Sequence, residues 1–191
     1  MKRLVPFAVA LVLLAGLAGA TTPALAQDRT VELAVGPQYP LMSRLIEVDQ
    51  ELGWHVRLGL RIRPRIWLNF TWENLPTGDD LGYDKDVDFD FYGIGTTFVL
   101  NGEEGFRLIG VLNAGAGNID FQDPPEETGK PADSRIDFWY EAGFGALFDS
   151  NERIVFRLQL TYRRLSPKHP NLIMEGSRGM IVPSFDVAFR F

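Results

Sequence analysis

The C-terminal stretch, residues 183–191, reads PSFDVAFRF and decides the fold. Phe185, Val187, Phe189 and Phe191 are spaced two residues apart, and small or polar residues fill the positions between them. Because successive side chains of a strand point to opposite faces, this spacing predicts a strand with one apolar and one polar face. The alternation continues to the final phenylalanine, whereas the ends of soluble chains tend to fray. The stretch therefore predicts the closing strand of a membrane β-barrel, in which the last ring has an apolar environment.

The opposite end of the chain predicts export. A positive start at residues 2–3 precedes an apolar run over residues 4–20, and the small-residue sequence ALA follows at 24–26. These are the three regions of a secretory signal peptide. A transmembrane helix is the alternative, but the run is short and no second long apolar stretch follows it. We expect residues 1–26 to be a cleaved signal peptide and residues 27–191 to form one barrel domain.

Composition excludes several classes of protein. Loss of Lys2 and Arg3 leaves 17 of the 19 basic residues against 25 acidic ones, so the mature chain carries 17 − 25 = −8 charges. This balance argues against a nucleic-acid partner. The sequence contains no cysteine, which excludes a disulfide framework and an N-terminal lipid anchor. Stability must therefore come from the core or from the membrane.

Period-two runs divide the mature chain into eight predicted strands, at residues 30–36, 54–62, 65–73, 87–100, 106–121, 135–148, 154–165 and 180–191. Three connections are short, at 63–64, 101–105 and 149–153, and they alternate with four long ones at 37–53, 74–86, 122–134 and 166–179. Short turns at one end and long loops at the other are typical of bacterial outer-membrane barrels. We predict an all-β fold: an eight-stranded antiparallel transmembrane up-and-down β-barrel with both termini on the short-turn side.

The polar faces of these strands carry charges of both signs. A charge that faces lipid at mid-membrane costs about 2–4 kcal/mol, so this face should line the lumen. The predicted lumen charge network consists of Glu32, Arg57, Arg61, Glu73, Arg107, Asp137, Glu141, Arg157, Arg163, Asp186 and Arg190. A barrel of eight strands has room for side chains and little else, and buried charges are retained when they are paired. We predict a plug of salt bridges, with a narrow gated ion path as the alternative.

One predicted strand breaks the alternation. Between residues 87 and 100, Phe89 and Phe91 lie on one phase, whereas Tyr92 and Ile94 lie on the other. We interpret this break as a β-bulge or a change of environment near Phe91, where the strand leaves the bilayer.

Aromatic residues fall at both ends of the predicted strands, as the girdles of membrane barrels do. The outer set is Trp54, Trp72, Tyr140 and Tyr162, and the inner set is Phe98, Phe106, Phe148, Phe189 and Phe191. A soluble eight-stranded barrel such as a lipocalin would instead turn its apolar face inward around a ligand. The polar face fits that alternative less well, because it contains many glycines and both signs of charge.

With its signal peptide, the Gly-rich stretches FYGIG at 91–95 and YEAGFG at 140–145, and the final FDVAFRF, the mature chain resembles the small bacterial outer-membrane β-barrel proteins of the OmpA transmembrane-domain and OmpW-like group. The resemblance implies a Gram-negative outer membrane as the location, and membrane lipid and lipopolysaccharide as partners. It also implies that the barrel-assembly machinery reads Phe185, Val187, Phe189 and Phe191 during insertion. We expect a monomer without a cofactor, with a structural or envelope-interaction role. A narrow, porin-like channel for small or hydrophobic solutes is the alternative.

A second resemblance concerns chemistry. Eight-stranded lipid A deacylases carry a His-x-Ser pair near the outer end of the penultimate strand, and the similar stretch here ends in Arg164-Leu165-Ser166. A serine needs a neighbouring base to become nucleophilic, and an arginine cannot accept a proton. His169 and Glu175 lie downstream, but we interpret Ser166 as the start of a loop turn and His169 as a solvated loop residue. We expect no enzyme, with a degenerate deacylase-like barrel as the second alternative.

The remaining candidates are polar groups in or near the long loops. The acidic strip Asp79, Asp80, Asp84, Asp86, Asp88 and Asp90 lacks the pattern of a calcium loop, so we interpret it as a solvated face and expect no metal site. Arg164, Lys168 and Arg178 gather around the last loop and suit lipopolysaccharide phosphates, since guanidinium groups bind phosphate well. We interpret His55 as a polar group of the lumen or rim.

Overall fold

The computed structural model describes residues 31–42, 52–77, 87–101, 105–121, 133–150, 153–167 and 178–191. The elements are β1 (Val31–Gln38), β2 (Leu41–Met42), β3 (Gly53–Arg63), β4 (Ile66–Thr77), β5 (Val87–Val99), β6 (Phe106–Phe121), β7 (Asp133–Asp149), β8 (Ile154–Pro167) and β9 (Arg178–Arg190). Within these ranges, no helix is long and apolar enough to cross a membrane. The predicted signal peptide lies outside the described residues.

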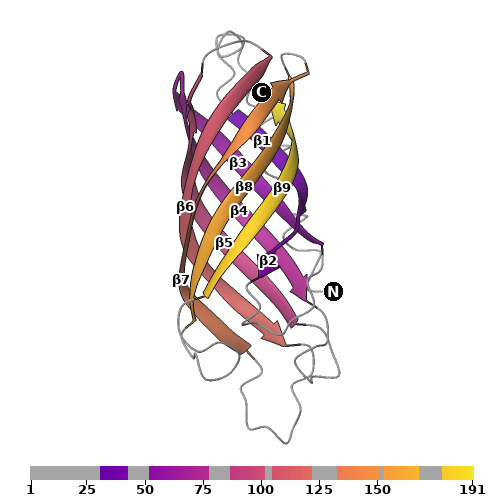
Figure 1. Cartoon of the computed structure of the whole chain (residues 1–191), viewed down its shortest axis with the longest axis vertical. Coiled ribbons are helices and arrows are strands. Elements are labelled where there is room, and N and C mark those ends of the chain that lie inside the picture. Colours follow the sequence, from indigo (N-terminus) through magenta and orange to yellow (C-terminus); the bar gives the residue numbers. More distant parts are fainter. Residues whose placement is uncertain are drawn as a thin grey trace, which may run out of the picture.

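Each long strand pairs antiparallel with the next long strand along the chain, and β1 pairs with β9 to close the sheet (Figure 1). The two-residue β2 also pairs with β9, beyond a break in β1 at Tyr39 and Pro40. It therefore continues the first strand after a short interruption. The prediction of a closed eight-stranded antiparallel barrel is confirmed, whereas β2 was not predicted. The C terminus lies at the short-turn end, which is uppermost in Figure 1.

Several strands extend further towards the long-loop end than predicted. β4 reaches Thr77, β7 begins at Asp133 and β8 reaches Pro167. Their backbones keep pairing where the apolar alternation fades, because the hydrogen-bond ladder does not need an apolar face. The interpretation of Ser166 as the start of a loop turn was wrong, since Ser166 lies within β8 opposite Phe138.

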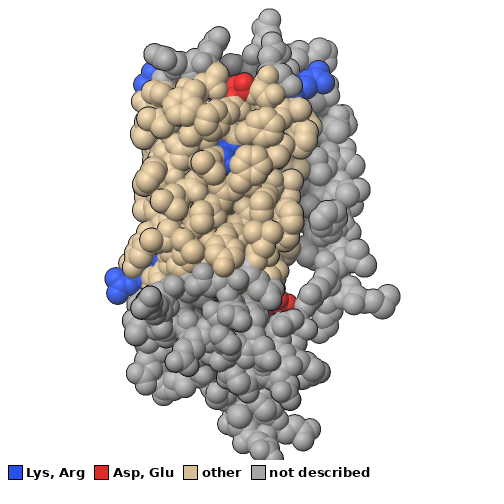
Figure 2. Space-filling view, turned by 45° about the vertical axis from the view of Figure 1, so that its right-hand side comes forward, with Lys and Arg blue, Asp and Glu red and all other residues tan. Residues whose placement is uncertain are grey.

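The outer wall of the barrel is apolar. Large apolar side chains that point away from the lumen are strongly exposed, such as Phe144 at 65% and Leu158 at 55%. In Figure 2 the visible wall is almost free of charge, and most coloured residues lie near its upper and lower edges. A charge-free band bordered by charges is the surface that a hydrocarbon layer requires.

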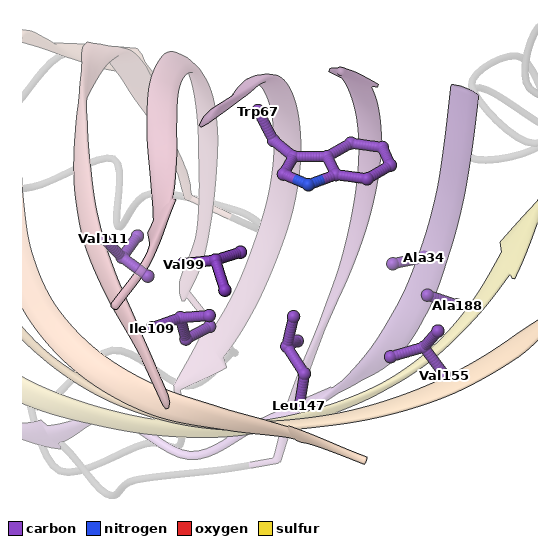
Figure 3. Packing of buried hydrophobic residues seen from close by; sticks show 8 residues of the cluster. All are labelled: Ala34, Trp67, Val99, Ile109, Val111, Leu147, Val155 and Ala188. Carbon is purple, nitrogen blue, oxygen red and sulfur yellow. The ribbon is translucent and has the colours of Figure 1, made fainter. Parts of the chain in front are cut away.

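The lumen contains an apolar layer near the short-turn end. It consists of Ala34, Trp67, Val99, Ile109, Val111, Leu147, Val155 and Ala188, which come from seven strands and point inward (Figure 3). All eight residues are at most 6% exposed. The lumen of this barrel is therefore filled by apolar as well as polar side chains.

The interpretation of a bulge near Phe91 was wrong. β5 keeps a continuous register from Val87 to Val99 with both β4 and β6. Phe89 and Phe91 are fully buried, so these two apolar side chains point into the lumen and not outward. The register shifts of the described strands lie elsewhere, in β3, β6 and β7. The break in alternation marks a second apolar layer in the lumen, at the long-loop end.

Gly36 lies at the seam between β1 and β9, where the two backbones approach closely. A Cβ atom at this position would lie 1.8 Å from the main-chain oxygen of Phe185. We predict that Gly36→Ala destabilises the closed barrel by about 1–3 kcal/mol, because overpacking forces the backbone to move. The measurement is the temperature at which the folded, fast-migrating form disappears in detergent electrophoresis.

Gly110→Ala is the matched control for this substitution. A Cβ atom at Gly110 has as its nearest neighbour the Leu100 Cδ2 atom at 3.9 Å, which is ordinary contact. This variant should stay within about 0.5 kcal/mol of the natural protein. Equal stability of the two variants would contradict the role of Gly36 in closure.

Candidate functional site in the barrel lumen

The structure places most of the predicted network residues inside the barrel. Seven of them are at most 5% exposed: Glu32, Arg57, Glu73, Glu141, Arg157, Arg163 and Asp186. Arg107 and Arg190 are partly buried, with 20% and 12% of their side-chain surface exposed. Arg61 is partly exposed near the short-turn end. Asp137 falls at the register shift in β7, and its side chain lies outside the described ones.

The pairs nearest the short-turn end join four strands, and one of their carboxylates was not predicted. Asp149 accepts from Arg107 at 2.5 Å and from Arg190 at 2.9 Å. Arg190 also donates to Glu32 at 3.1 Å and lies 5.6 Å from the centre of the Trp67 ring. Asp149 was assigned to a turn, but it is the last residue of β7 and faces inward. Leu147, two residues earlier on the same strand, faces the lumen, and continuing the alternation from it could have predicted that Asp149 faces inward as well.

The middle of the lumen continues this chain of charges. Arg157 pairs with Glu32 and lies 3.5 Å from Asp186. Asp186 accepts from Arg57 at 2.8 Å, and the Arg57 guanidinium also donates to the Gln159 side-chain oxygen at 2.8 Å.

His55 lies beside Asp186 and is 2% exposed, so the interpretation of His55 as a polar lumen residue agrees with its position. Its neighbour Asp186 therefore has positively charged or proton-bearing groups on three sides: Arg57, Arg157 and His55.

Arg163 is the centre of a second cluster towards the long-loop end. Its guanidinium group donates to Glu73 at 2.6 Å and to Glu141 at 2.7 Å. Glu141 also accepts from Asn113 at 2.6 Å and from the Thr161 hydroxyl at 3.1 Å. These contacts give the buried Glu141 a full set of donors, which is what makes a buried charge tolerable.

Aromatic rings hold the other side of Arg163. Its guanidinium carbon lies 4.5 Å from the centre of the Trp139 ring and 5.0 Å from that of Phe91. Cation–π contacts of this kind contribute about 0.5–2 kcal/mol each, more when water is absent. The Trp139 indole donates to the Ala116 carbonyl at 3.1 Å, which fixes the ring in place.

The side chains around Arg163 form the apolar layer at the long-loop end. Leu75, Phe89, Phe91, Trp139, Leu165 and Met180 are all at most 2% exposed. They come from strands β4, β5, β7, β8 and β9. Apolar layers thus lie towards both ends of the lumen, and Arg107, Asp149 and Arg190 lie nearer the short turns than the layer at that end.

The charges of the paired network balance. Five arginines (57, 107, 157, 163 and 190) face five carboxylates (32, 73, 141, 149 and 186) in the ion pairs described above. Between the two clusters lies a polar cavity of about 10 Å³, lined by residues such as His55, Gln159 and Thr161. A space of this size holds about one water molecule. No group of three His, Cys, Asp or Glu residues in the described part of the chain could hold a metal ion.

The other predicted residues lie on the outer wall or outside the described parts. Trp54, Tyr140, Tyr162, Phe106, Phe148, Phe189 and Phe191 are exposed outward, and Trp72 and Phe98 are partly exposed. Their location at membrane interfaces stays a prediction. Phe185 is exposed and Val187 partly exposed on the same wall.

The candidates around the last loop are only partly described. Arg164 and Ser166 are exposed. The side chain of Arg178 and the residues Lys168, His169 and Glu175 lie outside what the structure describes.

The interpretation of the acidic strip as solvated was wrong for one member. Asp88 is 8% exposed, and Asp90 is partly buried and accepts from Asn74 at 3.2 Å. Both lie in β5, which starts within the strip. The other four members lie outside the described residues.

A closed eight-stranded wall with an apolar exterior and a paired, charged lumen defines an outer-membrane type of β-barrel. Solved structures of other proteins share this fold. Neisserial surface protein A matches with a TM-score of 0.55 at 9% identity, over 84% of this chain and 94% of that one. Ail of Yersinia pestis matches with a TM-score of 0.50 at 14% identity, over 85% and 97%.

The third match is the N-terminal barrel domain of Pseudomonas aeruginosa OprF, with a TM-score of 0.50 at 11% identity, over 85% of this chain and 98% of that one. No protein-family model and no curated protein matches the sequence. The predicted fold, that of the small outer-membrane barrels, is confirmed. At such low identities the likeness shows the fold alone.

Arg163→Gln tests how much the cluster around Arg163 contributes to the stability of the barrel. The substitution leaves Glu73 and Glu141 buried without their arginine, and removing one partner of a buried pair costs about 3–5 kcal/mol. We predict a loss of this size in the free energy of unfolding, measured by urea titration of the protein in lipid vesicles.

Arg164→Gln is the control, since Arg164 is the next residue and is exposed on the outer wall. Its effect should stay near 0.5 kcal/mol or less, about the usual value for surface positions. A similar loss in both variants would show that stability depends on the net charge of the protein and not on the buried cluster.

Proposed function

We propose that the protein is an outer-membrane β-barrel with a structural or envelope-interaction role, and that its lumen is closed to solutes. The observation that carries the proposal is the chain of ion pairs from Arg107 through Asp186 to Arg57, together with the separate cluster at Arg163. These pairs cross the lumen between strands that lie far apart in the sequence. They fill the space through which a solute would pass.

The size and lining of the lumen support closure over conduction. The cavity between the clusters has room for about one water molecule, and an apolar layer lies towards each end of the lumen. A hydrated ion that entered would have to separate buried pairs, and an unpaired buried charge is costly. The alternative of a narrow channel therefore requires a different arrangement of these side chains.

The location and partners belong to the same proposal. The apolar outer wall supports membrane residence, with outer-membrane lipid and lipopolysaccharide as partners at the long-loop end near Arg164, Lys168 and Arg178. The predicted signal peptide provides export. The outward rings of Phe185, Phe189 and Phe191 on the last strand support recognition by the barrel-assembly machinery.

Electrophoretic mobility and cell fractionation test the location. A folded barrel resists detergent, so unboiled protein should migrate differently from boiled protein and should be recovered with outer membranes. We expect both results because the apolar wall cannot be exposed to water. Recovery as a soluble periplasmic protein without a mobility shift would refute the proposed location.

Planar-bilayer recording tests the closed lumen. We predict no steady unitary current from the natural protein. A variant that lacks both Glu32 and Arg157, each replaced by alanine, should conduct, because it removes one pair from the middle of the lumen. In this variant Asp186 keeps Arg57 and Arg190 keeps Asp149, so no charge is left unpaired. Frequent, steady currents from the natural protein would favour the channel instead.

A further inference from the structure

The tight turn between β3 and β4 presents two arginines at the short-turn end of the barrel. Arg63 is the last residue of β3 and pairs with Ile66, so Pro64 and Arg65 form the whole connection. Arg63, Pro64 and Arg65 are all exposed. The two arginine side chains therefore branch from backbone positions that are two residues apart on a very short loop.

These two arginines lack partners, unlike the other arginines whose side chains the structure describes. Arg57, Arg107, Arg157, Arg163 and Arg190 form the ion pairs of the lumen. Arg61, Arg153 and Arg164 also have interactions within the protein. Within the described residues, Arg63 and Arg65 have no ion pair, side-chain hydrogen bond or ring contact. Two like charges without a paired acid on one short turn form a site to which an anion would add stability.

The backbone holds this pair in place. The Val99 main-chain N–H donates to the Arg65 carbonyl at 2.8 Å, which ties the turn to the end of β5. Pro64 fixes its own backbone angle φ and lowers the freedom of the loop. A site whose backbone is already ordered loses less entropy when a ligand binds.

The surroundings of the pair indicate the chemistry of the ligand. Ile62, next to Arg63, is 59% exposed, and Leu100, next to Val99, is 60% exposed. Ile62 and Leu100 extend the apolar outer wall to its edge. The arginines therefore lie at the expected boundary between the hydrocarbon layer and the lipid headgroups. Guanidinium groups bind phosphate oxygens in a bidentate manner, and long side chains at such edges extend their charge towards the interface.

We propose that Arg63 and Arg65 form a binding site for the phosphate of an anionic phospholipid in the leaflet at the short-turn end. The inference rests on the proposed function for its membrane location. A headgroup with net negative charge suits two adjacent cations better than a zwitterionic one, whose amine would be repelled. The site is separate from the lipopolysaccharide contacts proposed near Arg164, which lie at the opposite end of the strands.

The test is a titration of phosphatidylglycerol into the purified, folded protein in neutral detergent, followed by native mass spectrometry. Each arginine near anionic lipid contributes about fivefold to binding, so Arg63→Gln with Arg65→Gln should weaken the apparent affinity about 30-fold. Arg63→Lys with Arg65→Lys keeps the charge but not the bidentate geometry, and should lose part of this affinity. Phosphatidylcholine should bind the natural protein more weakly than phosphatidylglycerol.

Arg153→Gln is the matched control, because Arg153 is exposed at the same end but already has an interaction within the protein. It should leave phosphatidylglycerol binding within about twofold of the natural value. Equal binding by the Gln double variant and the natural protein would overturn the site, and so would an equal loss in Arg153→Gln. Full competition by inorganic phosphate at concentrations similar to the lipid would overturn a lipid as the ligand.

The mobility shift on boiling separates this inference from the proposed function. Each variant must first show the shift of a folded barrel, so that loss of the fold is not mistaken for loss of lipid. A folded, non-conducting barrel that binds phosphatidylglycerol without dependence on Arg63 and Arg65 would leave the proposed function intact and refute the site.

Discussion

Pairing between arginine and carboxylate groups across the lumen is the interaction on which the rest of the structure depends. An eight-stranded wall that faces lipid must turn its polar side chains inward, and there they lie within hydrogen-bond distance of one another. Arg157 illustrates the constraint: it is 2% exposed and lies between Glu32 on β1 and Asp186 on β9. Without both partners its burial would be very unfavourable. The ion pairs inside the lumen therefore also join the strands that close the wall.

Apolar layers complete this arrangement. Trp67 and its neighbours lie towards the short turns, and Phe91 and Trp139 lie towards the long loops. Arg163 and Arg190 each contact a ring of one of these layers, so each layer is joined to the charged network by an arginine. Low-dielectric surroundings strengthen an ion pair when its partners are all present. The apolar layers and the ion pairs of this lumen are thus parts of one packed core.

Strand positions could be predicted from the sequence because side-chain alternation directly reflects the pleat of a strand. Alternation also identified the inward charges, including Arg57, Glu141 and Asp186, since only one phase can face lipid. It could not identify the partner of each charge, because pairs across a barrel depend on strand tilt and stagger, which alternation does not contain. It also misjudged Phe89 and Phe91, because an apolar residue is compatible with either face. Asp149 was missed because a turn and a strand end look alike in sequence.

Two of the lumen ion pairs join residues of the first strands to residues of the last strand. The Arg190–Glu32 hydrogen bond spans 158 positions, and the Arg57–Asp186 bond spans 129. Contacts of such long range form late in folding, because a large loop must close before they stabilise anything. Until β9 pairs with β1 and β8, the barrel is open. Glu32 then lacks its partners Arg157 and Arg190, and one edge each of β1 and β8 is unpaired. Folding of this barrel should therefore be nearly all-or-none, and the arrival of β9 determines when the pairing of β1 can be completed.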